Sequence, residues 1–309
     1  MIYTVTLNPA IDKTVEIPSF TAGIVNRVQQ SREDAGGKGI NVSKCLRALG
    51  EPSVAVMLLA GEAGSHLEKM AQSEGLTVLP FWTQGQTRTN LKVVDTQLGR
   101  NTDINEPGPQ VTEQLLEQML ENLCQRLQSG DIVVLAGSLP KGAPVNTYGK
   151  WTARLREMKV RVFLDADGLC MVEGIRQKPW LIKPNETELG RVLGRETQSR
   201  EQILDGGREL LAQGVSNVVV SMGGNGGCFL WQEGGFWAKS LSVPVLSTVG
   251  AGDSVVAAMA YGFSRGLPKE EQIRVAMAMG AASVMQSGTQ APDRETVFRL
   301  AQQVELENI

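Results

Sequence analysis

The chain has 309 residues, with 30 basic and 33 acidic side chains and a formal net charge of -3 at pH 7. Hydrophobic residues make up 42% and charged residues 20%, which are ordinary values for a folded globular protein and exclude a disordered or fibrous chain. The near balance of charge, without a run of five like charges, argues against a nucleic-acid partner. No stretch of eighteen apolar residues predicts a membrane span, and the start lacks a basic region before an apolar one, so we expect a cytoplasmic location and no membrane partner.

Four cysteines and a single histidine restrict the chemistry. Cys45, Cys124, Cys170 and Cys228 are widely separated and form no C-x-x-C pair, so we expect reduced core thiols. Any Ser-His-Asp or Cys-His mechanism would depend on His66 alone, at the head of a predicted surface helix. If the protein is an enzyme, its general base is therefore expected to be a carboxylate.

Short apolar runs alternate with helical stretches along the chain. The predicted strands are Ile2 to Leu7, Val54 to Ala60, Ile132 to Ala136, Val160 to Leu164, Trp180 to Ile182 and Val218 to Val220. Helices are predicted at Gly39 to Leu49, at an apolar stripe that includes Cys124 and runs from Leu115 to Leu127, and from Pro268 to about Met285. This alternation predicts the α/β class, with a mostly parallel sheet flanked by helices.

Two regions, Ile11 to Glu33 and Thr87 to Glu106, break the alternation because no helix separates their strand-like runs. Within the second region, Asn90 to Val94 and Arg100 to Asn105 flank a five-residue loop and predict a hairpin. We expect the two regions to form a small, discontinuous β-sheet that closes over a site as a lid.

The string Gly250-Ala251-Gly252-Asp253 leads directly into an apolar helix. Glycines at a helix entrance expose backbone N-H groups, which together with the positive end of the helix dipole can stabilise a phosphoryl group in transfer. The Asp253 carboxylate in the first turn could accept a proton from an attacking hydroxyl. An acidic residue and loop glycines also make an ordinary helix start, and the string alone leaves both interpretations open.

A second glycine-rich string, Gly36-Gly37-Lys38-Gly39-Ile40-Asn41, also enters a helix. Its glycines allow close approach to the backbone, while Lys38 and Asn41 offer donors to hydroxyl or phosphate oxygens. It is not a Walker A loop, because Gly39 follows the lysine where that motif needs Ser or Thr. A purely structural helix entrance is equally compatible with this string.

Three further features are candidates for phosphate or metal binding. Asn185 and Glu188 share a helix face after a predicted strand and could hold the water shell of Mg²⁺, although they also match a capping box, which we favour from the string alone. The glycine loop from Gly223 to Gly227 could contact phosphate or simply turn a hairpin. Arg27 and Arg88 have forked donors that suit a substrate phosphate, but surface arginines are usually only solvated.

Taken together and in this order, these strings resemble the ribokinase (PfkB-type) family of carbohydrate kinases from Met1 to about Gly288. Gly36 to Asn41 is similar to the N-terminal signature of that family, and Thr248 to Asp253 is similar to the C-terminal one. The start Thr4-x-Thr6-Leu7-Asn8-Pro9-Ala10-x-Asp12, with Gly137-Ser138-Leu139-Pro140, narrows the resemblance to kinases of phosphosugars, especially fructose 1-phosphate and tagatose 6-phosphate. Asp167 departs from the family pattern, which commonly has a hydroxyl residue there.

The resemblance implies one kinase domain over residues 1–309 with a Rossmann-like sheet, a β lid that often joins two subunits, and ATP with Mg²⁺ as the phosphoryl donor. It implies that Asp253 is the base and that Gly250, Ala251 and Gly252 complete the anion hole. The expected substrate residues are Asp12, Arg27, Gly37, Lys38, Asn41, Arg88 and Ser138. The expected nucleotide and metal residues are Lys183, Asn185, Ser221, Gly223 and Gly226, with Glu188 beside Asn185 at the water-mediated magnesium site.

The expected reaction is the ATP-dependent phosphorylation of D-fructose 1-phosphate to fructose 1,6-bisphosphate, by a homodimer joined through the lid. Tagatose 6-phosphate and fructose 6-phosphate are alternative acceptors within the family. A sugar-phosphate sensor without turnover is an alternative of a different class, which intact Asp253, Asn185 and Glu188 argue against. A nucleoside kinase is disfavoured, because the arginines and the Asn-Pro-Ala-x-Asp start favour a phosphorylated acceptor.

Overall fold

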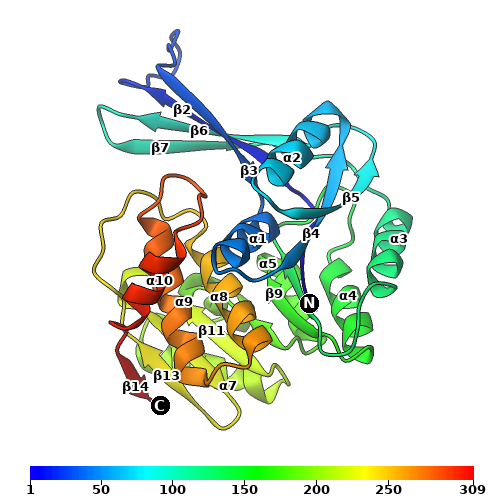
Figure 1. Ribbon diagram of the computed structural model, residues 1–309, viewed down its shortest axis with the longest axis vertical. Helices are drawn as coiled ribbons and strands as arrows, with labels where there is room; N and C mark the ends of the chain where they lie inside the picture. The colour runs from blue at the N-terminus through cyan, green and yellow to red at the C-terminus, as the bar shows by residue number, and fades with distance from the viewer.

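A computed structural model describes all residues from Met1 to Ile309. Its main element is a ten-stranded sheet in the order β14-β13-β12-β11-β10-β9-β8-β1-β4-β5, which runs through the body of the molecule (Figure 1). The pairs from β11 to β5 are all parallel, so the predicted α/β class with a mostly parallel sheet is confirmed. These parallel strands are β1 (Ile2–Thr6), β4 (Ser53–Ala60), β5 (Thr77–Thr83), β8 (Ile132–Ala136), β9 (Arg161–Asp165), β10 (Leu181–Ile182) and β11 (Asn217–Ser221).

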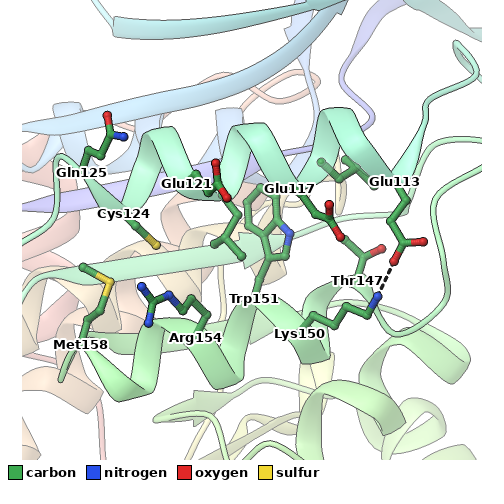
Figure 2. A pocket seen from close by; sticks show the side chains of 12 residues that line it. Glu113, Glu117, Glu121, Cys124, Gln125, Thr147, Lys150, Trp151, Arg154 and Met158 are labelled. Carbon is green, nitrogen blue, oxygen red and sulfur yellow. Dashed lines mark hydrogen bonds and ion pairs between the residues drawn. The ribbon is translucent and has the colours of Figure 1, made fainter.

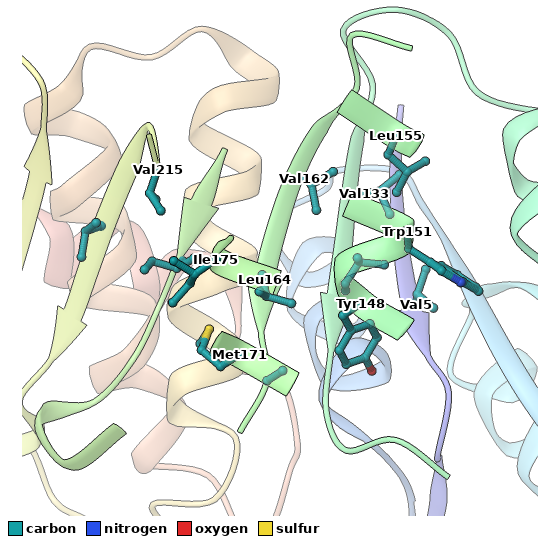
Figure 3. Close-up of a cluster of buried hydrophobic side chains, with 14 of the residues drawn as sticks. Val5, Val133, Tyr148, Trp151, Leu155, Val162, Leu164, Met171, Ile175 and Val215 are labelled. Atoms are coloured by element: carbon teal, nitrogen blue, oxygen red, sulfur yellow. The ribbon is translucent and has the colours of Figure 1, made fainter. Parts of the chain in front are cut away.

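The central strands are apolar because helices cover both of their faces. Every residue of β1 and of β8 is buried, as expected for a parallel sheet between two helical layers. One layer packs with Val5, Val133 and Val162 into the cluster drawn in Figure 3, which also includes Tyr148 and Trp151. That layer consists of α3 (Glu113–Cys124), α4 (Thr147–Glu157), α5 (Gly168–Ile175), α6 (Glu186–Leu193) and α7 (Arg200–Ala212).

The opposite face of the sheet carries the helices that contain both glycine-rich signatures. Alternate residues of the same strands, such as Ile132 and Val134, pack with these helices into a second cluster. The layer consists of α1 (Lys38–Ala48), α8 (Ala251–Arg265), α9 (Lys269–Val284) and α10 (Arg294–Ala301), with α2 (Gly61–Ser73) at the β4 side. None of the helices is long and apolar enough to cross a membrane.

The sheet ends in an antiparallel extension that the sequence analysis did not predict. Strands β12 (Gly227–Trp231), β13 (Gly234–Ala238) and β14 (Leu306–Asn308) add to β11 in turn. The glycine loop from Gly223 to Gly226 lies between β11 and β12 and contains one short 3-10 turn. The loop therefore is a hairpin connection, and it also lines a cavity described below.

A separate sheet of four strands, in the order β3-β2-β6-β7, projects from the upper end of the body (Figure 1). Its strands are β2 (Ala10–Ile17), β3 (Gln30–Gly36), β6 (Arg88–Asp95) and β7 (Arg100–Asn105). Strands β6 and β7 pair antiparallel from Asn90↔Asn105 to Asp95↔Arg100, which confirms the predicted hairpin. We call these strands and their connecting loops the small sheet.

A groove of about 630 Å³ lies between α3 and α4 (Figure 2). Glu113 of α3 forms an ion pair with Lys150 of α4 at one end, and Trp151 and the half-buried Cys124 contribute to its floor. None of the residues predicted for catalysis, substrate, nucleotide or metal lines this groove.

Candidate active site

The parallel strands bring most of the predicted site residues to one edge of the main sheet. The carboxyl ends of parallel strands meet at the same edge, which is where α/β proteins bind ligands. Along this edge, in sheet order, Ser221 ends β11, Lys183 follows β10, Asp165 ends β9, Ser138 follows β8 and Asn8 follows β1. With strands about 4.8 Å apart, these positions span roughly 19 Å. The predicted nucleotide residues occupy one end of this line, and the predicted acceptor residues occupy the other.

The helix α8 begins at this edge. Gly250 is its N-cap residue and has a φ of 80°, a left-handed conformation that favours glycine. No side chain caps the first turn, and the Ala251 N-H donates a long 3.4 Å hydrogen bond to the Thr248 carbonyl, so the N-H group of Gly252 remains available, together with the positive end of the helix dipole. This geometry is that of a helix start suited to an anion, and the anion-binding role of Gly250 to Asp253 remains a prediction.

Asp253 is in the first turn of α8 and is only 6% exposed. The side-chain amide of Asn41 donates a 2.8 Å hydrogen bond to its Oδ2 atom. Burial, followed by the negative charge of Asp165, raises the pKa of Asp253 to about 7. A carboxylate with a pKa near neutrality is suited to accept a proton from a hydroxyl at physiological pH.

A buried carboxylate between two lysines lies beside the predicted base. Asp165 Oδ1 is 3.2 Å from Lys38 Nζ and 3.7 Å from Lys183 Nζ, and its side chain is 2% exposed. Burial alone would lower the pKa of Lys38, but the charges of Asp165 and Asp253 raise it, so this lysine stays protonated. The sequence analysis did not select Asp165. A polar residue directly after an apolar strand was the available signal.

On the acceptor side, residues of the small sheet lie against the start of α1. Asn90 donates a 2.9 Å hydrogen bond to Asp12 Oδ1, and burial raises the pKa of Asp12. Gly37, the N-cap residue of α1, has a φ of 126° and packs so closely that an added Cβ would lie 2.7 Å from Thr6. Asn90 was not selected from the sequence, because its contact with Asp12 depends on the parallel pairing of two distant strands.

Three predicted nucleotide residues line a single cavity of about 580 Å³. Ser221, Gly223 and Gly226 come from β11 and the loop after it, and Gly252 comes from the start of α8. The remaining wall is mostly apolar, including Phe229, Val243, Val255 and Met277. A mostly apolar cavity that ends at an anion-binding helix start suits a planar base joined to phosphates.

Asn185 and Glu188 form the capping box that the sequence favoured. Asn185 Oδ1 accepts a 2.8 Å hydrogen bond from the Glu188 N-H, and Glu188 Oε2 accepts one of 2.8 Å from the Asn185 N-H. Burial, followed by the carboxyl of Asp167, raises the pKa of Glu188. Two facing carboxyl groups are a donor set of oxygens that fits a hydrated Mg²⁺, so the cap and a metal role are compatible. In this arrangement Asn185 mainly holds Glu188.

Arg88 and Ser138 reach the acceptor side, whereas Arg27 does not within one chain. Arg88 begins β6 beside Ala10 of β2, next to the main sheet. Arg27 is exposed in the loop between β2 and β3 at the opposite end of the small sheet. Six residues separate Ala10 from Glu16 along β2, which corresponds to about 20 Å. The role of Arg27 as a phosphate ligand remains a prediction.

Six buried side-chain oxygens at or next to this edge have no hydrogen-bond partner. Buried polar atoms are rarely left unpaired, so these atoms can pair with water or with a polar ligand. The six atoms are Thr6 Oγ1, Asn8 Oδ1, Asn41 Oδ1, Asn90 Oδ1, Asp165 Oδ2 and Thr289 Oγ1.

The sheet edge, the anion-binding helix start and the buried carboxylate define the class of small-molecule kinases that use this type of α/β fold. The family described as pfkB family carbohydrate kinase matches residues 4–296, and the chain belongs to that family. It is 38% identical over 283 residues to 1-phosphofructokinase of Bacillus subtilis, covering 92% of each chain. It is 37% identical over 305 residues to 1-phosphofructokinase of Vibrio cholerae, covering 99% of this chain and 96% of the relative.

The fold agrees with this assignment. A crystal structure of phosphofructokinase-2 from Escherichia coli in complex with substrates and products superposes with a TM-score of 0.93. The two chains are 28% identical, and the match covers 98% of each. The resemblance to the ribokinase (PfkB-type) family predicted from the sequence is therefore confirmed, and family membership implies ATP and a metal ion as requirements of the reaction.

Proposed function

We propose that the protein transfers the γ-phosphoryl group of MgATP to the free primary hydroxyl of D-fructose 1-phosphate, which gives fructose 1,6-bisphosphate and ADP. The observation that carries this proposal is Asp253, buried at an anion-binding helix start with a pKa of about 7. The choice of acceptor rests on the relatives from Bacillus subtilis and Vibrio cholerae, both of which are 1-phosphofructokinases.

In this mechanism the oxygen of the sugar hydroxyl attacks the γ-phosphorus, and Asp253 accepts the proton of that hydroxyl. The bond between the γ-phosphorus and the bridging oxygen breaks, and ADP leaves. Asn41 holds the Asp253 carboxylate in place through its 2.8 Å hydrogen bond. The N-H group of Gly252 and the ammonium groups of Lys38 and Lys183 would stabilise the developing negative charge. Positioning and electrostatics supply most of the acceleration in phosphoryl transfer, so no covalent nucleophile is needed.

Glu188, positioned by Asn185, and Asp167 would hold Mg²⁺ through its water ligands. A metal ion bound there would neutralise charge on the ATP phosphates during transfer. We expect the small sheet to close over the acceptor and exclude water, which limits wasteful hydrolysis of ATP. Because MgATP and phosphosugars are metabolites of the cell interior, we expect the reaction to take place in the cytoplasm.

We further propose a homodimer joined through the small sheet. The outer strands β3 and β7 each leave one edge unpaired, and exposed edges of this kind favour pairing with another chain. Ile24 at 65% exposure, Val25 at 80% and Val28 at 52% lie on its outer loop, where a second copy would bury them. Light scattering on a size-exclusion column tests this. A monomer at micromolar concentration would contradict the proposal.

The test of the reaction is ADP release with MgATP and four acceptors: fructose 1-phosphate, tagatose 6-phosphate, fructose 6-phosphate and fructose. Asp253→Asn is assayed alongside. We expect a large preference for fructose 1-phosphate and a loss of roughly 10²- to 10⁴-fold in kcat for the variant. Fructose 6-phosphate is included because phosphofructokinase-2 of Escherichia coli has been crystallised with it. Preference for another phosphosugar would change the acceptor, and absence of turnover on all four would favour a sensor.

A further inference from the structure

Asn8 joins the two groups that are expected to bind the acceptor phosphate, although the sequence analysis assigned no role to it. Asn8 lies in the bend between β1 and β2 and is 5% exposed. Its side-chain amide donates a 3.3 Å hydrogen bond to Ser138 Oγ. Its backbone carbonyl accepts hydrogen bonds from Arg88, at 3.2 Å from Nε and 3.0 Å from Nη2. A single residue thus contacts both candidate phosphate ligands.

The hydrogen bond from Asn8 occupies one acceptor position of the Ser138 hydroxyl. A hydroxyl group has one donor and two acceptor positions. Because Asn8 donates to the Ser138 oxygen, the Ser138 proton points away from Asn8, and no protein atom accepts it. The Ser138 O-H is therefore free to donate to an anionic ligand.

Arg88 is held in a similar way. A guanidinium group has five N-H donors in a fixed plane. Three of them bind backbone carbonyls, two at Asn8 and one at Glu106, where the distance from Nη1 is 3.3 Å. One N-H on each terminal nitrogen remains free, which is the forked arrangement that suits a phosphate.

The surroundings of Asn8 leave no room for a different arrangement. The same amide nitrogen is 3.3 Å from the Pro107 carbonyl and 3.5 Å from the Leu139 carbonyl, so its two N-H groups are shared among these carbonyls and Ser138 Oγ. Its Oδ1 atom is buried without a partner and lies against Gly108, where an added Cβ would be 2.2 Å away. Gly108 also has a φ of 82°, so a side chain there would be both strained and obstructed.

We propose that Asn8 is the positioning residue that assembles the acceptor-phosphate site, by directing the Ser138 hydroxyl and the Arg88 guanidinium toward the phosphate of the sugar. This inference rests on the proposed function, because it assumes a phosphorylated acceptor. It goes beyond that function in naming the residue on which recognition of the phosphate depends.

The test compares the wild-type protein with Asn8→Ala and Asn8→Asp, both of which remove the hydrogen bond that the side chain donates to Ser138 and keep the backbone carbonyl that accepts from Arg88. KM is measured separately for the phosphosugar that the wild-type protein turns over and for MgATP, together with the midpoint of thermal unfolding. We expect Asn8→Ala to raise KM for the phosphosugar roughly 10- to 100-fold and KM for MgATP less than about threefold. Asn8→Asp is nearly isosteric, but the new carboxylate accepts the Ser138 proton and adds a negative charge. It should therefore raise KM for the phosphosugar more than Asn8→Ala does.

Two further variants separate positioning from a general loss of structure. Asn217→Ala removes another buried asparagine, which is 5% exposed. Asn217 begins β11, at the end of the strand away from Ser221, so the variant should leave both KM values unchanged. Ser138→Ala combined with Asn8→Ala should lose less than the product of the two single effects, because both act through one hydroxyl.

The outcomes distinguish the inference from the proposed function. If the wild-type protein turns over no phosphosugar, the proposed function fails, and the inference fails with it because it assumes a phosphorylated acceptor. If the wild-type protein is active, equal increases in both KM values for folded Asn8 variants would overturn the inference alone. A KM for the phosphosugar within threefold of wild type in folded Asn8 variants would also overturn the inference. Should Asn8→Ala not fold, Asn8→Asp provides the same decision.

Discussion

Asn41 Nδ2 donates a 2.8 Å hydrogen bond to Asp253 Oδ2 across 212 positions of sequence. The contact joins the first turns of α1 and α8, the two helices that follow the glycine-rich signatures. Both helix starts therefore face the same point, and the predicted base is tied to the substrate side of the site.

The pH dependence of catalysis should reflect the environment of Asp253. A base acts in its deprotonated form, and the pKa of this carboxyl is raised to about 7. We expect kcat/KM to increase tenfold per pH unit below about pH 7 and to level off above it. Since the hydrogen bond from Asn41 lowers the pKa, Asn41→Ala should move this midpoint to higher pH.

The measurement is kcat/KM for the phosphosugar between pH 5 and 9, at saturating MgATP, for both proteins. The midpoint is compared rather than the absolute rate, because Asn41 is also expected to contact the sugar. A wild-type profile that stays flat down to pH 5 would show that Asp253 titrates as an ordinary carboxyl, and an unchanged midpoint in Asn41→Ala would contradict the assigned contact.

The same carboxyl should make the protein less stable as the pH rises. Between the ordinary pKa of Asp, 3.8, and about 7, the folded state keeps a proton on Asp253 that the unfolded state has released. The free energy of unfolding therefore falls with rising pH across this window, and the full cost is present above it. Asp253→Asn lacks this pH-dependent cost of deprotonation. Its thermal unfolding midpoint, relative to that of the wild-type protein, should therefore be higher at pH 8 than at pH 5.

Asp205→Asn serves as the control for this experiment, because Asp205 is exposed on α7 and carries the same change in charge. Asp205→Asn should shift the midpoint of thermal unfolding by the same amount at pH 5 and at pH 8. A constant difference for Asp253→Asn as well would mean that the buried carboxyl is not protonated in the folded state.

The sequence predicted the local structure of the two helix starts well because each is a local pattern. Gly250 to Asp253 form a helix start through contacts between neighbours, and the same holds for the capping box of Asn185 and Glu188. Asp165 was missed because its importance arises from two lysines that only the sheet brings together. Lys38, expected at a sugar hydroxyl, donates to Asp165 in the structure, at 3.2 Å.

The missed strands have equally physical reasons. Strand β5 contains Pro80, which argues against a central strand, but β5 lies at the end of the sheet order, where one edge needs no hydrogen bonds. Strands β12 and β13 are short and follow each other closely, so no helix marks them as units of the parallel sheet, and β14 is only three residues long. The distal position of Arg27 could not be inferred, because it depends on the length and direction of β2.

Gly252→Ala should separate stability from activity. The residue is in the first turn of α8, where alanine is favoured over glycine, although by less than the roughly 1 kcal/mol of a helix interior. The added Cβ would lie 2.9 Å from Lys183 Nζ and displace that ammonium group from the anion hole. We expect an unchanged or higher thermal midpoint together with at least a tenfold loss in kcat/KM for MgATP. Unchanged kinetics would exclude Lys183 from the nucleotide site.

Contact between the small sheet and the body should depend on Arg32. Its Nε donates a 2.8 Å hydrogen bond to Asp34 Oδ2, and its Nη1 donates one of 2.9 Å to Ser287 Oγ in the body. Gly288→Ala would place a Cβ 2.2 Å from Arg32 Nη2 and displace it. We expect faster hydrogen exchange in β2 and β3 for both Arg32→Ala and Gly288→Ala.

Lys13→Ala is the matched control, because the 3.0 Å ion pair of Lys13 with Glu33 lies wholly within the small sheet. It should leave exchange in β2 and β3 close to wild type. Equal exchange in all three variants would show that the Arg32 contact contributes nothing to the position of the small sheet.

Glu188→Gln tests the metal role against the capping role of this side chain. Glutamine at the third helical position also completes a capping box, so the helix start and the thermal midpoint should be preserved. The change removes the carboxylate that would face hydrated Mg²⁺ beside Asp167, and we expect the Mg²⁺ concentration for half-maximal activity to rise roughly tenfold or more at fixed ATP. Asn185→Asp keeps both the cap acceptor and the Glu188 charge and should shift this concentration much less. If Glu188→Gln and wild type show the same Mg²⁺ dependence, the residue acts only as a cap, and the metal site must be sought among Asp165 and Asp167.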